Sequence, residues 1–161
     1  MYRNINSIMG RIVIRFVERP DSDDPEEIIR WFCAVFGFSG DENGVERTIF
    51  RHFAEAAYKH EGFTSSELTD DIDMARSTVI YHLNRFIEAG LLVKRGRTYY
   101  LRASELSKTI EEIEYDIERE MRRMLDTARE FDKLMETKEL TKTRNQRRQK
   151  GVVNAGKRPK E

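Results

Sequence analysis

Residues 68–92, LTDDIDMARSTVIYHLNRFIEAGLL, decide the fold. A helix is expected from about Ala75 to Ala89, because Gly90 and Leu91 supply the left-handed residue and the apolar contact of a Schellman ending. At about 100° per residue, one sector of this helix is apolar and predicts its core side: Val79, Leu83, Phe86 and Ile87. The outward side is polar and comprises Ser77, Thr78, Tyr81, Asn84 and Arg85, with Arg76 in the first turn.

The flanking residues predict a short helix before this one and a β-hairpin after it. Thr64 and Glu67 have the spacing of a capping box, so a short helix should run to about Asp71. Downstream, residues 91–94 and 98–101 are β-rich runs joined through Arg95-Gly96-Arg97, which favours a tight hairpin. The hairpin concentrates cations: Lys94, Arg95 and Arg97.

Upstream, the pattern predicts a strand and two helices. Residues 10–18 alternate enough for a strand, which needs a partner in the hairpin or in a second subunit. Asp24 and Pro25 provide a cap and a first-turn proline for a helix over residues 25–36. A glycine-rich loop should follow, and then an amphipathic helix over residues 45–59.

A helix of roughly 35 residues from about Ser104 is expected downstream of the hairpin, because apolar residues recur there at steps of three and four. Such a narrow stripe on so long a helix suits pairing with its own copy, and we expect a homodimer. The predicted dimerisation residues are Leu106, Ile110, Ile113, Ile117, Met121, Met124, Ala128 and Phe131.

Charge is distributed unevenly along the 161 residues, although the formal net charge is zero. Residues 141–161 hold eight Lys or Arg against one carboxylate, so the remaining chain is net acidic. This basic tail has little to bury and is expected to be disordered until it meets a nucleic acid. Its candidate contacts are Lys142, Arg144, Arg147, Arg148 and Lys150.

Composition argues against several classes of protein. Cys33 is the only cysteine, so no disulfide framework or thiolate metal site can form within one chain, and a cytoplasmic setting is expected. No apolar run is long enough to span a membrane. We find no phosphate loop, nucleophile elbow or zinc-spaced histidine pair, and therefore expect no enzymatic activity, metal or cofactor. His82, beside the core face, is expected to be structural.

Residues 68–92 resemble the arsenical-repressor-like winged helix-turn-helix family of archaeal and bacterial regulators, through Ser77-Thr78-Val79, His82-Leu83 and Glu88-Ala89-Gly90-Leu91. The resemblance implies that residues 75–89 form a recognition helix and that the hairpin is a wing. This sequence departs from the family pattern with Ala75 at the cap, Asp73 in the turn and no thiolate metal-sensing motif.

The fold class expected is therefore mainly α with a small β component. It comprises a strand-helix arm (residues 1–43), a winged helix-turn-helix domain (44–102), a long dimerisation helix (103–140) and a basic tail (141–161).

Two functions fit this plan, and a third, a protein-only adaptor, is weaker. The first is a DNA-binding transcriptional regulator in which the predicted recognition helix reads bases and the wing holds phosphates. The second is a ribosome-associated factor that binds ribosomal RNA or protein and dimerises or blocks subunits, a plan similar to that of archaeal ribosome-dimerisation factors. Its support is the basic tail and the acidic residues Glu67, Asp70, Asp71 and Asp73, which would repel a phosphate track.

Overall fold

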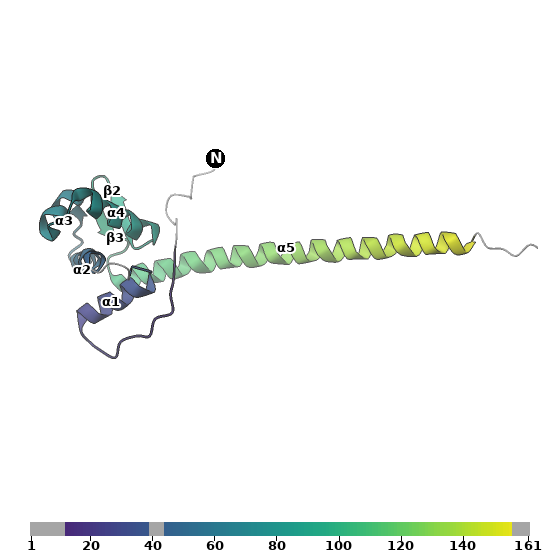
Figure 1. The fold of residues 1–161 in the computed structure, drawn as a ribbon, viewed down its shortest axis with the longest axis horizontal. Helices are drawn as coiled ribbons and strands as arrows, with labels where there is room; N and C mark the ends of the chain where they lie inside the picture. Colours follow the sequence, from purple (N-terminus) through teal and green to yellow (C-terminus); the bar gives the residue numbers. More distant parts are fainter. Residues whose placement is uncertain (1–11, 39–43, 156–161) are drawn as a thin grey trace, which may run out of the picture. The chain divides into compact units, whose positions relative to one another are not determined.

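The protein is mainly helical, with one small antiparallel sheet and a long C-terminal helix (Figure 1). The computed structural model describes residues 12–38 and 44–155, with side chains to residue 148. The chain divides into two units, residues 1–114 and residues 115–161. In order, the elements are α1 (Pro25–Val35), α2 (Val45–Ala57), β1 (Phe63–Thr64), α3 (Ser65–Ile72), α4 (Arg76–Glu88), β2 (Leu92–Arg95), β3 (Thr98–Leu101) and α5 (Leu106–Ala155).

The helix ends form as their sequences predict. The Asp24 carboxylate accepts a hydrogen bond from the Glu26 amide at 3.0 Å and begins α1, with Pro25 in the first turn. Thr64 and Glu67 complete a reciprocal capping box at the start of α3. At the end of α4, Gly90 has φ +78° and the Leu91 amide donates to the Phe86 carbonyl at 3.0 Å, which confirms the Schellman ending.

The core of the 1–114 unit lies between α1, α2, α4 and the sheet. Val79, Leu83 and Phe86 on α4 are fully buried, as the helical periodicity predicts, while Ile87 is only half-buried. The Phe86 ring stacks on Phe50 of α2 with centroids 5.8 Å apart. Buried Cys33 joins this core from α1, and burial raises the pKa of its thiol to about 12. The unit thus closes its own apolar interior.

The sheet has the order β1-β3-β2, and all its pairs are antiparallel. β2 and β3 form the predicted hairpin, with Arg95 opposite Thr98 and Gly96 in the turn at φ +62°. The short β1 pairs with the other edge of β3. Gly62, just before β1, permits this close approach, because a Cβ there would lie 2.4 Å from the Tyr99 carbonyl oxygen.

In the described part of the chain, the predicted N-terminal strand does not join the hairpin, and its pairing with a second subunit stays a prediction. Residues 12–18 belong to no helix or strand, and residues 10 and 11 lie outside the described residues. The segment instead runs beside α1, where the Arg15 amide donates to the Val35 carbonyl at 2.7 Å and the Trp31 indole donates to the Val17 carbonyl at 3.0 Å. The β3 edge of the hairpin is occupied by β1.

α5 is longer than the sequence predicted (Figure 1). It runs for 50 residues to Ala155, so the prediction of disorder is corrected for residues 141–155, while residues 156–161 lie outside the described part. Its C-terminal part has no proline before residue 156 and is rich in Lys, Arg and Gln, which are good helix formers. Threonine hydroxyls also bond back to carbonyls one turn earlier, as at Thr141 and Thr143.

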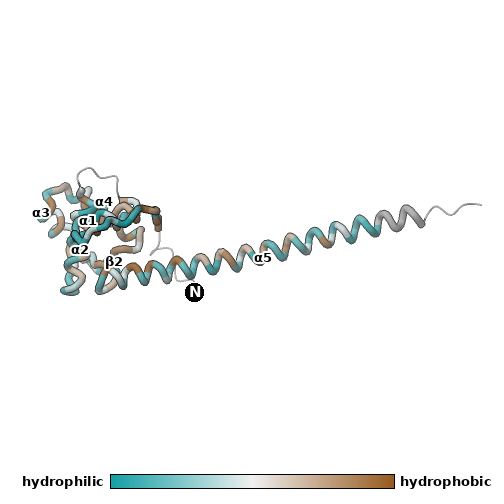
Figure 2. The backbone as a smooth tube through the Cα atoms, turned by 90° about the horizontal axis from the view of Figure 1, so that it is seen from below, coloured by the Kyte–Doolittle hydropathy of each residue, from teal (hydrophilic) through white to brown (hydrophobic). Residues whose placement is uncertain are grey.

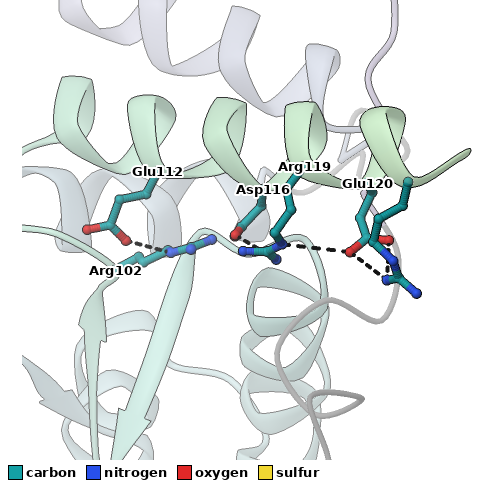
Figure 3. A network of polar contacts seen from close by, with 6 residues as sticks. Arg102, Glu112, Asp116, Arg119 and Glu120 are labelled. Atoms are coloured by element: carbon teal, nitrogen blue, oxygen red, sulfur yellow. Dashed lines mark hydrogen bonds and ion pairs between the residues drawn. The ribbon is translucent and has the colours of Figure 1, made fainter. Parts of the chain in front are cut away.

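The first turns of α5 belong to the 1–114 unit and are anchored there. Thr109 is fully buried and its hydroxyl accepts a hydrogen bond from the Ala103 amide at 3.1 Å. Ile113 is 2% exposed and lies against Gly90. Arg102, just after β3, donates to Glu112 at 2.8 Å (Figure 3). This corrects the dimerisation stripe at its start, because Ile113 is used within the chain and Leu106 and Ile110 are half-buried.

Candidate nucleic-acid interface

The outward face of α4 is the best candidate for a binding surface in the 1–114 unit. Arg76, Ser77, Tyr81 and Asn84 are exposed, and Thr78 is half-buried. Tyr81 exposes 59% of its surface. The helix begins at Ala75 without a side-chain cap, so its first amide groups have no such acceptor. Donors, acceptors and one aromatic ring are therefore presented together on one helix face.

The hairpin contributes the cations that the sequence indicated. Lys94, Arg95 and Arg97 are all exposed. Two of them lie against tyrosine rings of β3: the Lys94 ammonium is 5.1 Å from the Tyr99 centroid and the Arg95 guanidinium is 5.7 Å from that of Tyr100. Such cation–π contacts restrain long side chains while leaving the charge exposed. The tip of the hairpin thus carries three cations within four consecutive residues, 94–97.

Arg85 differs from the other predicted outward residues, because it is half-buried and paired within the chain. Its guanidinium pairs with the carboxylate of Glu46 on α2, and it lies 5.0 Å from the Phe38 centroid and 5.8 Å from that of Tyr81. The Glu46 side chain is 2% exposed, and a buried carboxylate requires such a partner. The Arg85 charge is therefore engaged within the chain, with the side chain 34% exposed, and its contact with phosphate stays a prediction.

His82, also on α4, is the third member of the polar cluster that Arg85 forms with Glu46 of α2. Its Nδ1 lies 3.2 Å from the same Glu46 oxygen, in agreement with the structural role expected for it. Sequence reasoning missed Glu46, although a signal was present. Glu46 shares the apolar face of α2 with Ile49, Phe50 and Phe53 at helical spacing, and a lone acid on such a face predicts a buried partner.

Carboxylates lie next to the candidate surface. Asp70 and Asp71 on α3 and Asp73 in the following turn are exposed, and α3 packs against α4. Asp73 has φ +54°, the left-handed conformation expected of the turn between the two helices. Glu67 is held by its cap: hydrogen bonds from the Thr64 amide and hydroxyl lower the pKa of its carboxyl. A polyanion approaching α4 must therefore avoid the end of α3.

A second group of cations lies near the C-terminal end of α5, in the 115–161 unit. Lys142, Arg144, Arg147 and Arg148 are exposed, and Lys142 pairs with Glu139 at 2.9 Å. Arg144, Arg147 and Arg148 share one helix face with Leu140. The side chain of Lys150, the remaining candidate, lies outside the described residues.

The described residues hold no group of three or more His, Cys, Asp or Glu side chains that could bind a metal ion. None of the helices within the described ranges combines the length and the apolar character needed to cross a membrane. Comparisons with protein-family models, with curated proteins and with solved structures found no match to this chain. A functional interpretation therefore depends on the geometry of the chain itself.

Proposed function

We propose that this chain is a homodimeric winged-helix protein that binds duplex DNA as a transcriptional regulator. The observation that carries the proposal is the exposed polar face of α4, with Ser77, Tyr81 and Asn84 uncovered, in a unit that also presents a cationic hairpin. The element order supports it: α3, a left-handed turn at Asp73, α4 and then an antiparallel hairpin.

In this proposal α4 enters the major groove, where its residues contact both base edges and the phosphate backbone. Ser77, Thr78, Tyr81 and Asn84 contact base edges, since hydroxyl and amide groups can both donate and accept there. Arg76 at the start of α4 and the hairpin cations hold phosphates, which sets orientation but carries no sequence information. Arg85 is a positioning residue, because its charge is engaged with Glu46.

Selection from a random duplex library with the full-length protein tests this function. A dimer presents two α4 helices related by two-fold symmetry, so the expected product is a pseudo-palindromic site. Tyr81→Ala should relax the selected sequence. Arg97→Gln should weaken binding evenly across sequences and lower the salt slope by about one unit. Arg129→Gln, the same charge change on α5, is the matched control and should alter neither. A selection that enriches no particular sequence would contradict the proposal.

A second candidate is a ribosome-associated factor, and a specific observation favours it. The end of α3 is acidic, and Arg85 is occupied by Glu46, so α4 offers Arg76 as its one exposed cation among the described residues. A duplex backbone gains little from such a surface. The hairpin and the basic end of α5 would then carry the contacts, to ribosomal RNA or to the small subunit.

Sedimentation of a native lysate through a sucrose gradient separates the two candidates. A ribosome-associated factor should travel with ribosomal subunits at low salt and leave that position after RNase treatment. Replacing Lys142, Arg144, Arg147 and Arg148 by Gln should abolish the association. A DNA regulator should instead remain with chromatin or near the dimer mass, whatever the RNase treatment.

A further inference from the structure

Most large apolar side chains of α5 beyond Tyr115 are exposed, and Ile117 is half-buried. Met124 and Phe131 are 64% and 60% exposed, and Met121 is 58% exposed. Figure 2 shows apolar segments, in brown, recurring among hydrophilic ones along α5. Leaving such side chains in water forgoes about 25 cal/mol for each Å² of apolar surface that could be buried. A stripe of this kind indicates an interface.

The spacing of the stripe identifies the kind of partner. Ile117, Met121, Met124, Ala128, Phe131 and Met135 follow one another at steps of 4, 3, 4, 3 and 4, which is a regular heptad. A heptad stripe packs against another heptad stripe in a left-handed pair of helices. In the described chain, α1 to α4 have at most 13 residues each and bury their apolar faces in the 1–114 unit. The fitting partner is α5 of a second copy.

The charges along α5 determine the direction of pairing. Residues 106–120 hold six carboxylates and two cations, whereas residues 138–148 hold five cations and one carboxylate. Local ion pairs compensate only some of these charges, such as Asp116 with Arg119 at 3.1 Å (Figure 3) and Arg123 with Glu120 at 2.8 Å. A parallel pair would place like charge beside like charge at both ends. An antiparallel pair places each acidic end beside a basic end.

We propose that two copies of this chain associate through an antiparallel pair of α5 helices, with Ala128 facing the partner's Phe131. In this register the smallest residue of the stripe faces the largest, and Met124 faces the partner's Met135. A parallel pair would bring Lys138 against the partner's Lys138 in the seam, and Lys142 against the partner's Lys142. The inference rests on the homodimer in the proposed function and specifies its geometry.

The pairing gives the basic end of α5 a second role. Lys142 of one copy lies near Ile117 and Glu118 of the other, and Arg147 and Arg148 lie near the partner's Glu111 and Glu112. These contacts are exposed, so salt should weaken the pair. The C-terminal cations then help to hold the dimer, whichever nucleic acid the 1–114 unit binds.

Disulfide cross-linking of the full-length chain tests the direction. Met121 and Lys138 face each other across an antiparallel pair in this register. We therefore expect a mixture of the Met121→Cys and Lys138→Cys proteins to form a cross-linked dimer under mild oxidation. Each variant alone should remain uncross-linked, because identical positions are then about 26 Å apart along the helices, beyond the reach of a disulfide. Buried Cys33, with its raised pKa, does not compete.

A parallel pair would reverse this pattern: each variant would cross-link to itself and the mixture would give no mixed product. That result, or a monomeric mass with no cross-linking in any sample, overturns the inference. Circular dichroism of both variants, matching that of the unmodified chain, controls for folding. The experiment contains no nucleic acid, so its outcome is independent of whether the chain binds DNA or RNA.

Discussion

Residues up to Glu114 and residues from Tyr115 onward place their apolar side chains differently. In the first unit Phe50, Phe53 and Phe86 are almost completely buried within the chain, whereas Met124 and Phe131 in the second unit are more than half exposed. Both units have regular apolar periodicity, so amphipathicity alone does not separate them. The difference teaches that the first unit completes its own core, while the second leaves its apolar stripe exposed, which is the basis of the proposed pairing with a second copy.

The largest effect should come from truncating one aromatic residue in each unit. Phe50 contacts Phe32 and Phe86, and Phe50→Ala should lower the free energy of unfolding by about 3–5 kcal/mol at any protein concentration. Phe131→Ala should leave the unfolding of the first unit unchanged and weaken association. Urea titrations followed by fluorescence of Trp31, the only tryptophan, measure the first unit directly. If both substitutions lowered the free energy of unfolding of the first unit equally, the proposed difference between the two units would be contradicted.

The next effect distinguishes two neighbours on α4. Arg85→Ala removes the guanidinium partner of buried Glu46 and should lower the free energy of unfolding by about 2–3 kcal/mol. Asn84→Ala removes an exposed amide and should change stability by less than about 0.5 kcal/mol, while weakening DNA binding. Thermal unfolding and duplex titration of both variants test this division. Arg85 as a phosphate contact would give the opposite pattern: unchanged stability and weaker binding.

A third prediction compares two glycines of the sheet region. Gly62→Ala should cost about 2 kcal/mol, because the new Cβ would meet the Tyr99 carbonyl oxygen at 2.4 Å and the Tyr100 ring at 2.6 Å. Gly96→Ala meets no atom within 4 Å, but its φ of +62° is unfavourable for alanine, which should cost about 1 kcal/mol. Melting temperatures that rank these variants in reverse order would refute the close approach of β1 to β3.

The smallest effect concerns the cap of α3. The hydrogen bonds from Thr64 lower the pKa of Glu67 from 4.5, so the folded state binds this proton less readily than the unfolded state. Its contribution is therefore complete above pH 4.5 and is lost as the pH falls through the lowered value. Glu67→Gln should flatten this part of the stability–pH curve. An unchanged curve in the variant would exclude the carboxylate as its source.

Much of the first unit follows from local chemistry. The capping box at Thr64, the cap at Asp24 and the Schellman ending at Gly90 each depend on residues within a few positions, so their elements could be predicted. The buried face of α4 follows from its period, and the hairpin follows from its two β-rich runs.

The differences from the sequence predictions have two origins: contacts between distant residues and, beyond Leu140, local helix propensity. The alternation in residues 12–18 says nothing of whether a sheet edge is free, and the two-residue β1 that takes the edge is too short to produce a pattern. The polarity of Arg85 suggested an outward side chain, because its partner Glu46 lies 39 residues away. The low hydropathy beyond Leu140 suggested disorder, although those residues have good helix propensity.

The most direct test of the central claim is the mass of the full-length chain by sedimentation equilibrium at micromolar concentration. If the stripe on α5 requires a second copy, the mass should be twice the 19.1 kDa of one chain. The double substitution of Met124 and Phe131 by Lys should return it to 19.1 kDa without changing the Trp31 unfolding curve. A monomeric mass for the unmodified chain would contradict the account.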